Sequence, residues 1–139
     1  HPYGWLKKPG IYAEIEKEAI AQSDIVSFHF YGDYEHSRQY IRILEQYGRP
    51  LINTEWMHRP YRSIIQTHLP LWKKHKVGSY FFGFVNGKAQ FNFVWEFIKK
   101  LPDIDTSLWM HDIFHSDFTP YDAEVIEVLK DCNKDKKIF

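Results

Sequence analysis

Helical and extended sequence patterns alternate along the first 85 residues of this chain. Amphipathic patterns indicate helices, over residues 11–22, 34–47 and 60–76. Short β-branched and aromatic runs between them indicate strands, over residues 25–31, 51–55 and 79–85. Strands that alternate with helices at this spacing are typical of parallel sheets with right-handed crossovers. The sequence therefore predicts an α/β fold built from parallel (β/α) units.

Prolines mark several expected helix boundaries. Pro70 is expected to kink or restart the helix at 60–76, because proline removes a backbone hydrogen bond. Residues 91–100 are a candidate for a further short helix. The last helix is expected to begin near Thr119 and Pro120, since threonine suits the N-cap and proline the first turn.

Composition limits the class of protein. The 139 residues are enough for one domain with a core, assigned to residues 1–139. The 18 basic and 18 acidic residues cancel, which leaves no electrostatic footprint for nucleic acid or an anionic membrane. No apolar run reaches membrane-spanning length, and a single cysteine, Cys132, allows no internal disulfide. Because the chain starts with His1 rather than methionine, we expect its start to be either processed or cut from something longer, and we favour the second.

Polar and aromatic side chains lie at the ends of the three predicted strands. Alternation along 25–31 places Ser27, His29 and Tyr31 on one face. The second strand ends in Asn53 and Glu55, with Trp56 directly after it, and the third carries Phe82. Ligands of parallel α/β folds bind at the carboxyl ends of the strands.

This set of side chains suits a sugar-cleaving site. Glu55 could attack an anomeric carbon, Tyr31 could orient that carboxylate, and His29 could bond sugar hydroxyls. Asn53, Trp56 and Phe82 complete the predicted sugar contacts. The alternative is that Glu55 is a solvated residue that begins a loop.

Four ordered segments resemble the C-terminal half of the clan A glycoside hydrolases, closest to the family-five-like, or cellulase-family, group. These segments are SDIVSFHFY, YGRPLINTEWMHRP, VGSYFFGFVNGKAQ and LWMHDIFHSDFTPYDAEVIEVLK. The resemblance implies a (β/α)8 barrel, with residues 25–31 as strand six, 51–55 as strand seven and 79–85 as strand eight.

The resemblance also implies roles for single residues. It makes Glu55 the nucleophile, with His29 and Tyr31 beside it, and needs no cofactor or metal. Phe82 stands where that group usually has a tryptophan platform for sugar. Lys88 and Gln90, in the loop after the third strand, are expected to line the cleft. An extracellular or periplasmic location is an inference from the resemblance only.

The second carboxylate of a retaining glycosidase is missing from the sequence pattern. Such enzymes need two carboxyl groups about 5–5.5 Å apart, and the resembled group carries its acid/base in an Asn-Glu pair, which this chain lacks. A barrel also takes roughly 200 residues or more. We therefore expect the N-terminal half of the barrel in the same longer chain, or self-association. The competing hypothesis is a non-catalytic carbohydrate-binding or scaffold half-barrel.

The sequence alone assigns no definite functional role to two further groups of residues. His111 and His115 are four residues apart beside Asp112, but no third ligand is signalled, so no metal site is predicted. His58, Arg59 and Tyr61, just beyond Glu55, either reach a substrate or pack the loop.

Overall fold

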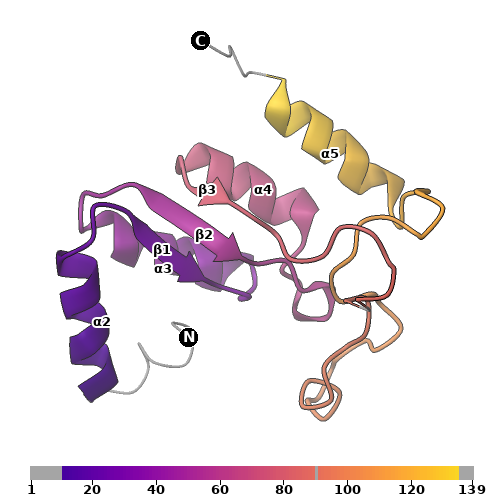
Figure 1. Ribbon diagram of the computed structural model, residues 1–139, viewed down its shortest axis with the longest axis horizontal. Helices are drawn as coiled ribbons and strands as arrows, with labels where there is room; N and C mark the ends of the chain where they lie inside the picture. The colour runs from indigo at the N-terminus through magenta and orange to yellow at the C-terminus, as the bar shows by residue number, and fades with distance from the viewer. Residues whose placement is uncertain (1–10, 90, 135–139) are drawn as a thin grey trace.

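Three parallel strands form the centre of the fold in the computed structural model, which describes residues 11–89 and 91–134. The strands are β1 (Val26–His29), β2 (Leu51–Glu55) and β3 (Gly78–Ser79), in the order β1-β2-β3. Helix α3 (Tyr34–Glu45) connects β1 to β2, and α4 (Ile65–Lys74) connects β2 to β3. The predicted mixed α/β fold with parallel strands is confirmed (Figure 1).

Two more helices flank this unit. Helix α2 (Ile11–Ala21) precedes β1, and α5 (Ala123–Asn133) packs against α4 (Figure 1). Arg49, in the turn before β2, donates a hydrogen bond of 3.2 Å to the carbonyl of Ala21. This contact ties the end of α2 to the start of β2. No helix among the described residues is long and apolar enough to cross a membrane.

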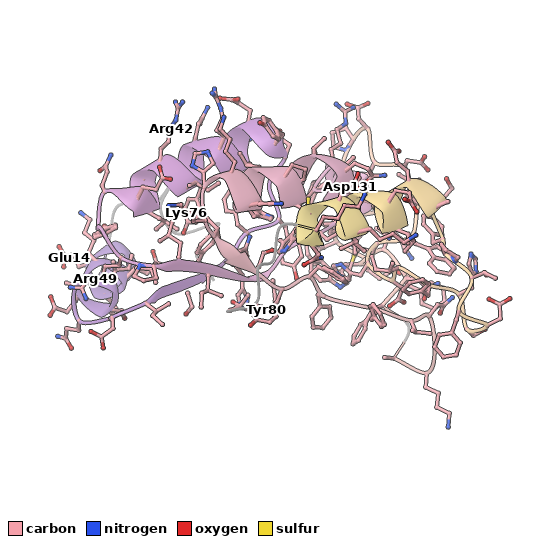
Figure 2. All side chains as sticks on the ribbon, turned by 90° about the horizontal axis from the view of Figure 1, so that it is seen from above. Glu14, Arg42, Arg49, Lys76, Tyr80 and Asp131 are labelled. Atoms are coloured by element: carbon pink, nitrogen blue, oxygen red, sulfur yellow. The ribbon has the colours of Figure 1, made fainter. Side chains whose placement is uncertain are left out.

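The two faces of the sheet differ in their surroundings. Helices α3 and α4 lie on one side of it (Figure 2). Val26 and Phe28 of β1 are buried toward these helices, where the Phe28 ring meets the edges of Tyr40 and Trp72 at centroid distances of 5.5 and 6.5 Å. Ser27, which points to the other face, is exposed. The core therefore lies between the sheet and the helices, as the alternation of β1 predicts.

The third predicted helix is two elements rather than one. A single 3-10 turn, η1 (Arg59–Tyr61), is followed by α4, which begins at Ile65. Pro70 lies inside α4 and does not interrupt it, so the expected break there is wrong. The break falls earlier, at Arg62, whose left-handed backbone (φ 58°) ends η1.

The third strand is shorter than residues 79–85. After Ser79 the chain keeps two more contacts with β2 and its extension, from Tyr80 N–H to the Asn53 carbonyl (2.9 Å) and from Phe82 N–H to the Trp56 carbonyl (3.5 Å). Gly83 then takes φ 87° and turns the chain. Beyond it, the Phe84 carbonyl accepts hydrogen bonds from the later segment around Ile113 rather than continuing the ladder.

Two other helix predictions are also wrong. Residues 91–100 form turns and no helix. The last helix begins at Ala123 with Asp122 as its N-cap, accepting from the Glu124 N–H at 2.9 Å, and not near Thr119. Thr119 instead donates to Asp117 through its hydroxyl (2.6 Å). Asp122, the residue directly before the helix, therefore caps it, and Thr119 instead closes a turn with Asp117.

Candidate functional site

Glu55 ends the central strand, and a β-bulge decides which way it points. Phe28 pairs with Asn53, but the next residue of β1, His29, pairs with Glu55, so that Thr54 is the extra residue. Strict alternation would place Glu55 on the helix-covered face with Leu51 and Asn53. The extra residue reverses the order of faces and brings Glu55 to the face of His29.

Two side chains from the end of β1 contact the Glu55 carboxylate. The Tyr31 hydroxyl donates to Glu55 Oε2 at 2.9 Å. His29 Nδ1 lies 3.3 Å from the same oxygen. The side chains of His29 and Glu55 are 36% and 33% exposed, so a ligand can reach them from solvent. The structure thus brings together three of the predicted site residues, Glu55, Tyr31 and His29.

The protonation of Tyr31 is fixed by its surroundings. Burial raises the pKa of the Tyr31 hydroxyl, and the hydrogen bond to the Glu55 carboxylate and its negative charge raise that pKa further. Tyr31 therefore remains a hydrogen-bond donor across the ordinary pH range. Its bond occupies one lone pair of Oε2 and holds the carboxylate in one orientation.

Two buried histidine side chains, His111 and His58, lie near Tyr31 of this group. His111 lies near Tyr31, with ring centroids 5.9 Å apart, and near Phe82 at 5.4 Å. His58 lies 6.3 Å from Tyr31 and 6.0 Å from His111, and both histidines are fully buried. Burial lowers the pKa of each imidazole to about 4, and each is therefore neutral at pH 7.

Hydrogen bonds assign the tautomers of these two histidines. His111 Nδ1 lies 2.6 Å from the Met57 carbonyl; since a carbonyl only accepts, Nδ1 carries the proton. His58 Nδ1 accepts from the Tyr61 N–H at 3.2 Å, so its proton is on Nε2. Met57 holds its carbonyl in place through a left-handed backbone (φ 75°), which bulky residues seldom adopt.

Sequence reasoning did not identify His111 as a neighbour of Glu55. The two are 56 positions apart, and no element predicted from the pattern of residues 91–115 places them together. The link is Arg59, which is buried and donates to the carbonyls of Trp109 (3.2 Å), His111 and Asp112 (2.9 Å). Arg59 therefore packs the loop, which was one of the two expected roles.

Two of the remaining predicted site residues, Asn53 and Trp56, are placed apart from the Glu55 group. Asn53 and Trp56 are both 0% exposed. The Trp56 ring packs against His68 and Trp72 at centroid distances of 6.1 and 5.9 Å, within the core. The bulge at Thr54 separates Asn53 from Glu55. No pattern in the sequence signals that extra residue.

The predicted residues of the third strand and its loop have mixed placements. Phe82 is partly exposed and packs against Phe91 at a centroid distance of 4.5 Å. Lys88 is exposed in a turn, and Gln90 lies outside the described residues. In the parts of the chain that the structure covers, no group of three or more histidine, cysteine or acidic side chains is arranged to hold a metal ion.

The site can act through a carboxylate that is oriented on one side and open on the other. This carboxylate can act as a nucleophile, as a base, or as an acceptor of a hydrogen bond from a ligand hydroxyl. The Tyr31 hydroxyl and the His29 imidazole both lie at its Oε2. Comparisons with known proteins do not extend this description: no family model, curated protein or solved structure matches the chain.

Proposed function

We propose that this chain carries the nucleophile of a retaining β-glycoside hydrolase, and that Glu55 is that nucleophile. The observation that supports the proposal is the group at the end of β2. There Tyr31 donates to Glu55 Oε2 at 2.9 Å and His29 lies 3.3 Å from it. A carboxylate of this kind, at the carboxyl end of a parallel strand, faces the region where α/β folds bind ligands.

In the proposed reaction Glu55 attacks the anomeric carbon of a β-linked sugar. The bond from a Glu55 oxygen to that carbon forms as the bond to the leaving oxygen breaks, and the leaving oxygen takes a proton from an acid. Water then hydrolyses the glycosyl ester and restores the carboxylate. Tyr31 holds Glu55 in the attacking orientation, and His29 bonds a sugar hydroxyl.

The proposed architecture is the C-terminal part of a (β/α)8 barrel. Strands β1, β2 and β3 would be strands six to eight, with α3 and α4 on the outside. The support is the parallel order and the single helix-covered face of the sheet. The other five strands, and the acid/base carboxyl group, would come from an N-terminal half of the same protein or from a partner.

A non-catalytic carbohydrate-binding module is the second candidate. It is favoured by one observation: among the described residues, no second carboxyl group is hydrogen-bonded to Glu55 or to Tyr31. Retaining hydrolysis needs a second one about 5–5.5 Å away. Sugar binding needs no such partner.

The first prediction concerns covalent labelling of Glu55. In the intact protein, a 2,4-dinitrophenyl 2-deoxy-2-fluoro-β-glycoside should form a stable glycosyl ester on the peptide that contains Glu55, which mass spectrometry of a digest detects. The dinitrophenolate leaves with little acid assistance. Glu55→Gln should abolish the label and reduce turnover roughly 10⁴-fold, as the loss of a covalent catalyst does, while the free energy of unfolding changes little.

Glu45→Gln is the matched control, because Glu45 is a carboxylate on α3 that pairs with His75 at 2.8 Å. This variant should label normally. A label on another residue, or normal turnover by Glu55→Gln, would contradict the assignment. Saccharide binding without label or turnover in the unmodified protein would favour the binding module.

A further inference from the structure

A pocket of about 380 Å³ adjoins Glu55 through Tyr31. The Tyr31 ring lines the pocket, and its hydroxyl bonds the Glu55 carboxylate. Three more aromatic side chains line the pocket, namely Tyr61, Trp95 and Phe97. The volume lies within the range of about 300–1,000 Å³ that small-molecule sites have.

Trp95 and Phe97 form a partly exposed aromatic pair in the pocket lining. Their rings are stacked, with centroids 5.5 Å apart and planes at 24°. Trp95 is 38% exposed and Phe97 63% exposed. The edge of Tyr31 meets Trp95 at 5.8 Å and 75°, which fixes the indole against the Glu55 group. The exposed outer face of such a stacked pair, here that of Phe97, suits the C–H face of a pyranose.

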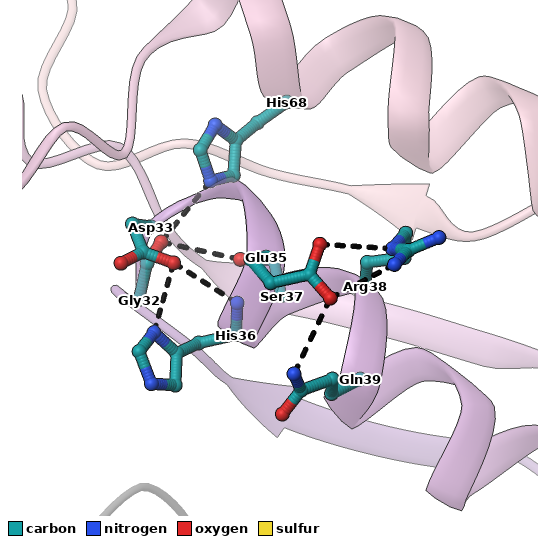
Figure 3. A network of polar contacts seen from close by, with 8 residues as sticks. All are labelled: Gly32, Asp33, Glu35, His36, Ser37, Arg38, Gln39 and His68. Atoms are coloured by element: carbon teal, nitrogen blue, oxygen red, sulfur yellow. Dashed lines mark hydrogen bonds and ion pairs between the residues drawn. The ribbon is translucent and has the colours of Figure 1, made fainter.

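The polar rim of the pocket consists of Asp33 and His36, at the start of α3 (Figure 3). Asp33 Oδ1 accepts from the His36 N–H at 2.9 Å and lies 2.8 Å from His36 Nδ1. Since the carboxylate only accepts, His36 Nδ1 donates to Asp33. The rim therefore presents the Asp33 carboxylate and the His36 ring to a ligand.

Hydrogen bonds below the rim keep it in place. The Gly32 carbonyl accepts from the Ser37 hydroxyl at 3.1 Å and from His68 Nε2 at 3.0 Å (Figure 3). Both donors are fully buried. The segment from Tyr31 to Asp33 is thereby fixed between the Glu55 group and α3, which holds the two sides of the pocket in one arrangement.

We propose that this pocket binds one pyranose ring of an uncharged sugar chain whose neighbouring unit lies at Glu55. The choice of a sugar as the ligand rests on the proposed function of Glu55. Phe97, the more exposed ring of the stacked pair, packs on the sugar ring, Asp33 accepts hydrogen bonds from its hydroxyl groups, and His36 Nε2 bonds a further hydroxyl. A uronic acid is excluded, because its carboxylate would face the carboxylate of Asp33.

Calorimetric titration of the intact protein carrying Glu55→Gln tests this pocket without turnover. The probes are the β-1,4-linked tetrasaccharides of glucose, xylose and mannose. Phe97→Ser should weaken binding of the best probe about tenfold, the scale of one lost stacking contact. Asp33→Asn should weaken it about three- to tenfold, while asparagine still caps α3.

The control is Phe93→Ser, because Phe93 is 59% exposed in the same segment and lies outside the pocket lining. It should bind like the parent. Parent-like binding by both Phe97→Ser and Asp33→Asn, or no binding of any probe, overturns the pocket proposal. If Glu55 takes no covalent label but the pocket variants still weaken binding, the nucleophile proposal fails and the pocket remains a sugar site.

Discussion

His58 and His111 are the residues whose ionisation the fold restricts most plainly. Each is fully buried, and each ring already uses Nδ1, His58 as an acceptor and His111 as a donor. Protonation would place a charge in a site where, within residues 11–89 and 91–134, no carboxylate is in hydrogen-bond contact with either ring. Because both rings are neutral, the polar contacts of the Glu55 carboxylate come from Tyr31 and His29.

This environment predicts acid sensitivity. The unfolded imidazoles bind protons below pH 6.5, whereas the folded pKa values are about 4, so the unfolded state binds more protons between these limits. The free energy of unfolding should therefore be highest above pH 6.5 and fall as the pH is lowered toward 4. At pH 5 each ring should have lowered it by roughly 2 kcal/mol relative to its value above pH 6.5. Urea unfolding at pH 7, 6 and 5 measures the loss.

Nuclear magnetic resonance of the imidazole rings gives the independent check. The ring signals of His58 and His111 should not titrate between pH 7 and 5 while the protein is folded. A midpoint near 6.5 for either ring would show that it is not held neutral by burial.

Single residues also show where sequence reasoning succeeded and failed at the site. The alternation of β1 correctly separated His29 and Tyr31 from Phe28, because side chains on a regular strand have a period of two. The same rule failed on β2, where Thr54 is an extra residue. Asn53 lies before this extra residue and stays buried on the helix-covered face, whereas Glu55 lies after it and reaches the face of His29.

Among the elements, α4 contains a proline that the helix tolerates. Pro70 lies in the middle of Ile65–Lys74 and is exposed. It has no N–H to donate to the Gln66 carbonyl, the partner that an α-helix would give it. The helix persists because its other face is anchored by buried His68, Leu71 and Trp72.

Replacing this proline should stabilise the protein. Pro70→Ala restores the hydrogen bond, and we expect the free energy of unfolding to rise by about 1–2 kcal/mol. That is less than the helix-propensity difference of about 3 kcal/mol, because alanine also gains freedom in the unfolded chain. Urea unfolding checks this, with Pro102→Ala, in an exposed turn, as the control that should lose up to about 1 kcal/mol. A less stable Pro70→Ala would mean that the ring makes contacts that offset its helix cost.

Element prediction failed mainly where tertiary contacts replace local pattern. The helices α2 and α3 were predicted within two residues of their ends, because their apolar stripes and flanking breaks are local signals. Residues 91–100 were a candidate for a short helix but form turns. Their backbone is used elsewhere: the carbonyls of Phe91 and Asn92 accept from His111 (3.2 Å) and Met110 (2.9 Å).

At the scale of the whole molecule, the helices that the structure describes cover one side of the sheet only. Helices α3 and α4 lie against the face that carries Val26 and Phe28, and the described residues place no helix on the opposite face (Figure 2). Tyr80, 66% exposed, lies after β3 at the edge of this unit. Buried parallel sheets are generally covered on both faces. The barrel proposal accounts for this asymmetry, because the open face would become the barrel interior.

Ser27 offers a direct test of that interpretation. It lies on the open face of β1 and is exposed in this structure, so an arginine there would cost little if water covers the face. If the face is the packed interior of a barrel, Ser27→Arg buries an unpaired charge, and the intact protein should lose about 3 kcal/mol or more of unfolding free energy. Gln39→Arg, at an exposed position of α3, is the control and should stay within about 0.5 kcal/mol. Equal stability of the two variants in urea would contradict the barrel and leave the sheet open to solvent.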